Sequence, residues 1–305
     1  MPNDPGRVWT IRELMKFAIQ HLQARGIEEA RLNTELLLAH ALKLQRIQLY
    51  LNFEKPLNVE ELKNFRFLLE RRLKHEPVQY IIGSTNFMGL QFNVDANVLI
   101  PRPETETLIE RVIELVNDFT KNKPIKILDI GTGSGNIAIS IVKYIKQADV
   151  VAVDISESAI EVAQRNAVMH NVNSRIEFYR ADIYNLPERL KAIKFDIVVS
   201  NPPYIPKDEW EQLRSEIRDH EPSHALTDGK NGLSFYKQII QIIPTLLKPN
   251  GIIVFEVGYG QLDQIINELK AGGFNDFHIS NDMQDMPRVI SGIWGKPSFG
   301  IITTN

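Results

Sequence analysis

Apolar residues recur at helical spacing through roughly the first 75 residues of the chain. Three stripes have the three- and four-residue spacing that lines up one face of an α-helix, and they occupy residues 11–22, 32–44 and 59–73. Thr10 precedes the first stripe as an N-cap, and Gly26 follows it as a stop signal. We predict a small helical domain at residues 1–75, in which the stripes form the core.

The pattern changes after Pro77. Two short β-like runs, residues 79–82 and 91–94, flank Asn86-Phe87-Met88-Gly89, which predicts a β-hairpin linker at residues 76–100. The segment Pro101-Arg102-Pro103-Glu104-Thr105-Glu106 follows, and we expect a helix from there to Phe119. The alternative is that this segment is purely structural, a loop that is held by salt bridges and starts the helix.

Beyond Pro124, apolar runs alternate with amphipathic stretches. The predicted strands are residues 125–130, 150–154, 176–179, 195–200 and 251–257, and the predicted helices are residues 136–144, 158–169, 234–247 and 261–269. Such alternation predicts an α/β domain at residues 101–305, with a doubly wound, mostly parallel sheet. The last two runs, residues 274–279 and 288–294, are joined only by a loop, so we expect a terminal antiparallel strand.

Composition and charge narrow the possible functions. The 305 residues include no cysteine, which excludes disulfides, thiolate metal sites and cysteine nucleophiles, and we expect no bound metal ion. A net charge of -3 disfavours a protein built mainly to grip the nucleic-acid backbone, and we expect no direct binding to duplex nucleic acid. The start of the chain lacks a signal-peptide pattern and no apolar run could span a membrane, so we expect a cytoplasmic protein.

A glycine-rich loop follows the first strand of the α/β domain and opens a helix. Its sequence is Asp129-Ile130-Gly131-Thr132-Gly133-Ser134-Gly135-Asn136. Glycines there permit positive φ and let the backbone approach a ligand at the carboxyl edge of the sheet. The third glycine comes one residue earlier than in the dinucleotide fingerprint, which disfavours NAD, and no Lys-Ser or Lys-Thr closes the loop as in a P-loop.

Two further carboxylates follow the next two strands. Asp154 lies where an acid can bind both hydroxyls of a ribose, and Asp182-Ile183 lies where a carboxylate can meet an adenine amine beside an apolar wall. Each aspartate alone could be a loop or helix cap. Together with the glycine loop they indicate an adenosine site. We interpret the ligand as S-adenosylmethionine, with Asp129 placed to meet the ammonium of its methionine part.

The most informative segment is Asn201-Pro202-Pro203-Tyr204, directly after a predicted strand. The Asn201 side-chain oxygen and the Pro202 carbonyl could accept both hydrogens of one NH2 group and hold its nitrogen for methylation, with Tyr204 against the planar substrate. Positioning would then supply most of the rate, since the tetrapeptide contains no general base. A plain strand-terminating turn is the alternative.

Several segments resemble the peptide chain release factor glutamine methyltransferases over nearly the whole chain. They begin with Ala30-Arg31 and Glu35-Leu36-Leu37-Leu38-Ala39-His40, and the linker adds Glu76-Pro77-Val78-Gln79-Tyr80, Phe87-Met88-Gly89-Leu90 and Val98-Leu99-Ile100-Pro101-Arg102-Pro103-Glu104-Thr105-Glu106. Downstream segments include Glu221-Pro222, Gly232-Leu233, Phe255-Glu256-Val257-Gly258, Gln261 and Pro287-Arg288-Val289.

The resemblance implies a Rossmann-like methyltransferase that modifies the glutamine of the Gly-Gly-Gln loop in class I release factors, leaving S-adenosylhomocysteine as product. It implies cofactor contacts at Gly131, Thr132, Gly133, Ser134, Gly135, Asp154, Ile183 and Asn201, to which the pattern of the strand ends adds Asp182. It implies glutamine contacts at Asn201, Pro202, Pro203 and Tyr204, with Arg102, Glu104 and Thr105 bordering the site. Some family members have Trp where Ile183 stands, so ring stacking would become apolar packing here. The helical domain is expected to recognise the factor.

Three other functions fit part of the sequence pattern. An adenine or guanine amino-methyltransferase acting on RNA or DNA would share the tetrapeptide but would need a basic groove, and the helical domain has only small clusters such as Arg71-Arg72. An NAD-dependent oxidoreductase is disfavoured by the glycine spacing. A non-catalytic adaptor of the translation machinery would have no use for the tetrapeptide.

Overall fold

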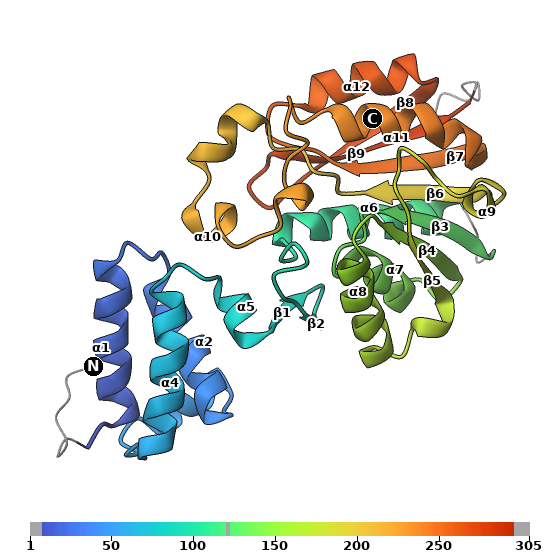
Figure 1. The fold of residues 1–305 in the computed structure, drawn as a ribbon. Helices are drawn as coiled ribbons and strands as arrows, with labels where there is room; N and C mark the ends of the chain where they lie inside the picture. The colour runs from blue at the N-terminus through green and yellow to red at the C-terminus, as the bar shows by residue number, and fades with distance from the viewer. Residues whose placement is uncertain (1–7, 120–122, 296–305) are drawn as a thin grey trace. The chain divides into compact units, whose positions relative to one another are not determined.

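The computed structural model describes residues 8–119 and 123–295, which form two compact units (Figure 1). One unit contains the chain up to Ser84 together with Arg214–His220, and the other contains Thr85–Leu213 and the chain from Glu221 onward. The predicted boundaries at residues 75 and 100 stay a prediction. The N-terminal residues 1–7, on which the signal-peptide argument depended, lie outside the described residues.

The smaller unit is helical. It consists of α1 (Ile11–Ala24), α2 (Ala30–Leu42), α3 (Arg46–Leu51), α4 (Val59–Arg72) and α5 (Val78–Ile82), with the short α10 (Ser215–Arg218) from later in the chain. Thr10 caps α1 as predicted: its hydroxyl accepts from the Glu13 amide at 3.3 Å, and the Glu13 carboxylate accepts from the Thr10 amide at 3.0 Å. The apolar stripes meet in one core around Leu14, Leu37 and Phe65.

One expectation for the linker is wrong. Residues 79–82 belong to α5, which follows Pro77 and ends at Gly83 with φ of +81°, and do not form a strand. A short apolar run fits a buried helical turn as well as a strand, so periodicity cannot separate the two. The hairpin itself is present, formed by β1 (Ser84–Phe87) and β2 (Leu90–Asn93). Its two turn residues, Met88 and Gly89, both have positive φ, as a tight hairpin turn requires.

The larger unit contains the predicted doubly wound sheet of seven strands in the order β5-β4-β3-β6-β7-β9-β8. The strands are β3 (Ile125–Ile130), β4 (Ala148–Asp154), β5 (Ile176–Arg180), β6 (Phe195–Ser200), β7 (Leu247–Glu256), β8 (Phe274–Asn281) and β9 (Pro287–Trp294). Strands β3 to β7 pair in parallel, and β9 is antiparallel to both β7 and β8. The expected antiparallel strand is therefore confirmed.

Helices cover both faces of this sheet (Figure 1). One face packs on α6 (Glu106–Phe119), α7 (Asn136–Tyr144) and α8 (Glu157–Met169), and the other on α9 (Glu188–Lys191), α11 (Ser234–Ile242) and α12 (Leu262–Ala271). Neighbouring residues alternate between the two cores, as Ile127 and Leu128 do on β3. Because both faces are buried, the carboxyl edge of the parallel strands is left for ligands.

The predicted helix at residues 234–247 is too long. The α-helix ends at Ile242, a 3-10 turn spans Ile243–Thr245, and β7 begins at Leu247. Pro244 lacks a backbone N–H, which ends the α-helical hydrogen-bond pattern although the apolar residues continue beyond it. No helix within the described ranges is long and apolar enough to cross a membrane.

Candidate functional site

The glycine loop leaves β3 at the carboxyl edge of the sheet and leads into α7. Gly131, Gly133 and Gly135 have φ of +75°, +54° and +79°, a region that disfavours residues with a Cβ. A Cβ at Gly131 or Gly133 would meet no atom within 4 Å, so both face open space. A Cβ at Gly135 would lie 3.1 Å from the Ala163 Cβ. The first two glycines therefore leave room for a ligand, and the third lets the loop pack on α8.

Asp154 holds this loop in place from the end of β4. Its Oδ2 accepts a hydrogen bond from the Gly133 amide at 2.9 Å, and its Oδ1 accepts one from the Ser156 amide at 2.9 Å. Ser156 is the N-cap of α8. One carboxylate thus fixes both the glycine loop and the start of the next helix, and it still lines the cavity described below.

Asp129 lies behind the loop and is fully buried. Its Oδ2 accepts a hydrogen bond from the Thr132 hydroxyl at 2.6 Å, while Oδ1 has no hydrogen-bond partner among the described residues. Burial raises the pKa of Asp129 to about 7, and the charge of Asp154 adds to this, while the bond from Thr132 opposes it. An unpartnered buried carboxylate oxygen is ready to accept from a cationic or N–H group of a ligand.

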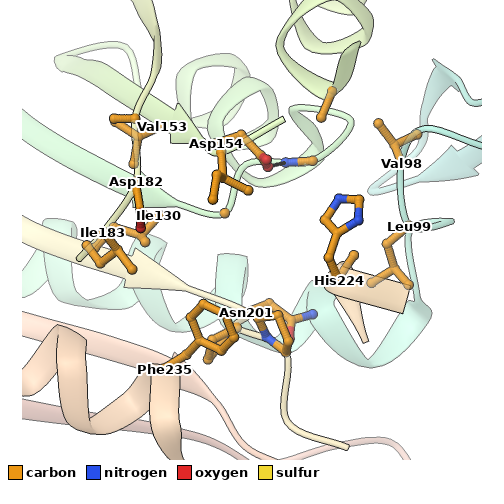
Figure 2. Close-up of a pocket in the computed structure, with 18 of the residues that line it drawn as sticks. Val98, Leu99, Ile130, Val153, Asp154, Asp182, Ile183, Asn201, His224 and Phe235 are labelled. Atoms are coloured by element: carbon orange, nitrogen blue, oxygen red, sulfur yellow. Dashed lines mark hydrogen bonds between the residues drawn. The ribbon is translucent and has the colours of Figure 1, made fainter. Parts of the chain in front are cut away.

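A cavity of about 250 Å³ opens at this edge of the sheet. Figure 2 shows Val153 and Asp154 on one side of it, with Asn201 and Phe235 opposite. Most of its wall is apolar, contributed by side chains such as Ile130, Val153, Ile183, Phe235 and Ile239. The polar groups are few and converge from separate strand ends, as is typical of a site for a partly aromatic ligand.

Of the sequence-predicted cofactor residues, the cavity wall includes Gly131, Gly133, Asp154, Asp182, Ile183 and Asn201. The Asp182 Oδ1 accepts from the Tyr184 amide at 2.9 Å, and Ile183 is buried beside it. The wall does not include Asp129, Thr132, Ser134 or Gly135, which stabilise the loop from behind. The individual contacts of all these residues with the cofactor stay predictions.

The segment Asn201-Pro202-Pro203-Tyr204 leaves β6 at the same edge, and its first three residues line the cavity. The Asn201 Nδ2 donates to the Thr105 Oγ1 at 3.2 Å. The Tyr204 ring packs on the core of the larger unit, not in the cavity wall, and burial raises the pKa of its hydroxyl. The predicted contact of Tyr204 with the substrate stays a prediction.

Close backbone packing holds the end of this segment. The buried Gln261 donates from Nε2 to the Tyr204 carbonyl oxygen at 2.9 Å. A Cβ on Gly258 would lie 2.9 Å from the Tyr204 ring, and a Cβ on Gly232 would lie 2.9 Å from the Tyr204 carbonyl carbon. The position of the tetrapeptide therefore depends on two glycines far from it in sequence.

Arg102 and Glu104 lie beside the cavity residues but do not line the cavity. The Arg102 Nη2 pairs with the Glu221 Oε1 at 2.5 Å, and the buried Glu221 also accepts from the Ile100 amide at 3.2 Å. Residues Pro103–Thr105 form a 3-10 turn that leads into α6. The loop is thus salt-bridged and starts a helix, and its predicted substrate contacts stay predictions.

Several residues of the cavity wall were not among the predicted site residues. Figure 2 shows Val98, Leu99 and His224 at one end of it and Phe235 near Asn201. Val98 and Leu99 lie within the linker segment that resembles the family, and no other feature of the sequence pointed to a role for them in the site. His224 lies in a 3-10 turn, Ser223–Ala225, and Phe235 lies in α11. Neither residue was itself part of a predicted motif, so the tertiary structure brings them to the cavity.

The doubly wound sheet, the glycine loop and the acid at the end of β4 define an α/β methyltransferase, and residues 121–288 match a family model described as a methyltransferase domain. S-adenosylmethionine is its methyl donor. The cavity fits this group: open space at two glycines, an apolar wall and carboxylates at the strand ends. The hMettl16 catalytic domain, solved with the MAT2A 3'UTR hairpin 6, shares the fold with a TM-score of 0.54 and 17% identity, covering 68% of this chain and 77% of that one.

Residues 13–83 match the PrmC N-terminal domain. Curated relatives named release factor glutamine methyltransferase include one from Geobacter sulfurreducens, 41% identical over 93% of this chain and 97% of its own length. Another, from Chlorobaculum tepidum, is 41% identical over 95% of this chain and 99% of its own length. The chain belongs to the release factor glutamine methyltransferase family, as its sequence motifs indicated.

Proposed function

We propose that this protein methylates the side-chain amide nitrogen of the glutamine in the Gly-Gly-Gln loop of class I release factors. The observation that carries the proposal is the position of Asn201 and Pro202 in the wall of the cofactor cavity, in a chain of this family. Both are hydrogen-bond acceptors at the carboxyl edge of the sheet, and an amide NH2 has two hydrogens to offer.

The chemistry needs little beyond positioning. When bound, S-adenosylmethionine supplies a methyl group on a positively charged sulfur. The Asn201 Oδ1 and the Pro202 carbonyl accept the two hydrogens of the glutamine amide and keep its weakly nucleophilic nitrogen in line. As the nitrogen gains the methyl group it becomes positive, and the same two acceptors stabilise that charge before one proton leaves to solvent. Ile183 and Phe235 give the cavity an apolar wall, so few other polar groups compete with these two acceptors.

The direct test uses labelled S-adenosylmethionine, an intact class I release factor and the same factor with its Gly-Gly-Gln glutamine changed to alanine. We expect label only in the unchanged factor. Label in both factors would place the modified residue elsewhere. Label in nucleic acid but in neither factor would favour the base-methylating alternative.

Asn201→Ala tests the assignment of the acceptor. We expect turnover to fall about 100-fold or more, because the nitrogen loses one of two contacts that align it. Cofactor affinity, measured by calorimetry, should change far less. Equal losses in turnover and in cofactor affinity would contradict the role of Asn201 as the acceptor for the substrate nitrogen.

The helical unit is proposed to recognise the release factor. Its match to the PrmC N-terminal domain supports this, as does a surface groove along α1 lined by Arg12, Lys16, Arg31 and Phe53. Lys16→Glu should raise the KM for the intact factor about tenfold with kcat unchanged. The matched control is Lys63→Glu, an exposed residue on α4 outside the groove. The same KM in both variants would refute a role of this groove.

A further inference from the structure

A chain of three side chains runs from the tetrapeptide into the interior of the larger unit. The Asn201 Nδ2 donates to the Thr105 Oγ1 at 3.2 Å, and the Thr105 Oγ1 donates to the Glu256 Oε2 at 2.6 Å. Thr105 and Glu256 are 2% and 1% exposed, so water cannot replace these bonds. The three residues come from separate elements: the end of β6, the turn before α6 and the end of β7.

The sheet brings two of them together. Strands β6 and β7 pair in parallel, with Ser200 beside Phe255, so the residues that follow each, Asn201 and Glu256, lie at neighbouring strand ends. The 3-10 turn Pro103–Thr105 supplies the hydroxyl between them. This arrangement is part of the fold itself, which keeps it in place before any substrate binds.

When Glu256 is ionised, only one arrangement of the hydrogens satisfies the two hydrogen bonds that join Asn201, Thr105 and Glu256. A carboxylate has no proton and can only accept, so the single Thr105 hydroxyl proton points to Glu256. The Thr105 oxygen must then accept from its other neighbour, which has to be the NH2 side of the Asn201 amide. The amide oxygen of Asn201 is thereby turned away from Thr105.

That orientation matters because Asn201 lines the cavity. With its oxygen free, Asn201 can accept a hydrogen from a substrate NH2 group. With the amide reversed, it would present its own NH2 to the substrate NH2, and two donors would oppose each other. The tetrapeptide alone cannot choose between these orientations, since both fit the same side-chain shape.

Glu256 is also close to the other end of the tetrapeptide. Burial raises the pKa of Glu256 to about 7, while the bond from Thr105, the charge of Arg288 and the nearby Tyr204 hydroxyl oppose this rise. One buried carboxylate is therefore bonded to Thr105, and through it to Asn201, and lies near the Tyr204 hydroxyl.

We propose that Thr105 and Glu256 are positioning residues that fix the amide of Asn201 with its oxygen toward the substrate nitrogen. The identity of that nitrogen rests on the proposed function, whereas the orientation of the amide does not. Thr105 acts through its hydrogen bond to Asn201, and Glu256 acts through its hydrogen bond to Thr105. Neither of them lines the cavity.

The test compares Thr105→Val, which keeps the shape but removes the hydroxyl, with Thr105→Ser, which keeps the hydroxyl. For Thr105→Val we expect kcat on the release factor to fall about 10- to 100-fold, with the Kd for S-adenosylmethionine within about threefold of the wild type. Thr105→Ser should stay within about threefold of the wild type in both. An unchanged kcat in Thr105→Val would overturn the proposal, as would equal losses in kcat and cofactor affinity.

Two further variants separate positioning from a merely structural role. A glutamine at position 256 can donate a hydrogen bond to the Thr105 oxygen, and the Thr105 hydroxyl is then free to donate to Asn201. Glu256→Gln should therefore also lower kcat with little effect on cofactor affinity. In the Asn201→Ala background, Thr105→Val should cause no further loss, because it has no amide left to orient. If the two losses multiply, Thr105 acts independently of Asn201 and the proposal fails.

A substrate-free measurement keeps this test distinct from that of the proposed function. The side-chain NH2 of Asn201, identified in NMR spectra by its absence in Asn201→Ala, should exchange slowly with water in the wild type and in Thr105→Ser. It should exchange rapidly in Thr105→Val. Equal exchange in the wild type and Thr105→Val would overturn the orientation. Failure of the wild type to label a release factor would refute only the proposed substrate.

Discussion

Gly232→Ala tests how tightly the tetrapeptide has to be held. Gly232 is buried, has φ of +78°, and its missing side chain leaves space that the Tyr204 carbonyl group fills. A Cβ there would lie 2.7 Å from the Gln261 Nε2 and 2.9 Å from the Tyr204 carbonyl carbon, and it would overlap the carbonyl oxygen itself. The substitution therefore affects both partners of the hydrogen bond that holds Tyr204.

The expected size of the effect follows from these contacts. A Cβ and a carbonyl oxygen normally approach to about 3.3–3.6 Å, so the Tyr204 carbonyl must retreat by about 1 Å. A shift of that size in a positioning segment can cost about 100-fold in turnover. The left-handed backbone adds about 1–2 kcal/mol of strain in the folded state. We expect kcat to fall about 100-fold, and the free energy of unfolding to fall by about 2–4 kcal/mol in total.

The matched control is Gly229→Ala. Gly229 has φ of +69° in the same loop, but a Cβ there would meet no atom within 4 Å. The control carries the backbone strain without the overlap, so its kcat should equal that of the wild type while its stability falls by about 1–2 kcal/mol. Methylation of the release factor at saturating cofactor measures kcat, and urea denaturation measures stability.

The comparison has a clear negative outcome. If Gly232→Ala keeps a kcat within about threefold of Gly229→Ala while both remain folded, the position of the Tyr204 carbonyl does not control the reaction. Close packing against Gly232 would then not be what positions the tetrapeptide for catalysis.

Other predictions follow from carboxylates of the larger unit. Asp154→Ala removes the acceptor for the Gly133 and Ser156 amides, so calorimetry should show cofactor affinity about 10- to 100-fold weaker, whereas Asp149→Ala on the same strand should leave it unchanged. Burial raises the pKa of Asp129 in the folded state to about 7, so the folded state holds this proton more tightly than the unfolded state does. The free energy of unfolding therefore falls as the pH rises toward that value. Between pH 5 and pH 8 the free energy of unfolding of the ligand-free wild type, measured by urea denaturation, should therefore fall by about 3 kcal/mol more than that of Asp129→Asn. An equal fall in both proteins would contradict the raised pKa of the buried Asp129. Arg102→Ala leaves the buried Glu221 carboxylate without its ion pair and should lower the free energy of unfolding by about 3 kcal/mol, against less than about 1 kcal/mol for Lys191→Ala in an exposed pair.

Local features of the chain were predictable because their causes lie within a few residues. Thr10 and Glu13 form a capping box across three residues, and Gly131, Gly133 and Gly135 adopt the positive φ that their spacing indicated. The parallel strands were predictable because continuous apolar runs buried on both faces alternate with amphipathic helices. Residues 79–82 were predicted wrongly because a short apolar run, here with Val78, Tyr80 and Ile81 buried, can form either a helical turn or a strand.

The sequence by itself determined the two kinds of domain, the glycine loop, the place of Asn201-Pro202-Pro203-Tyr204 after a strand, and the family. Each of these is a contiguous pattern. Only the tertiary structure joined Asn201 to Thr105, 96 residues away, and Thr105 to Glu256, 151 residues away. It also placed β9 between β7 and β8, and Gly232 against Tyr204. Such contacts depend on how strand ends meet at one edge of a sheet, and no spacing along the chain encodes that.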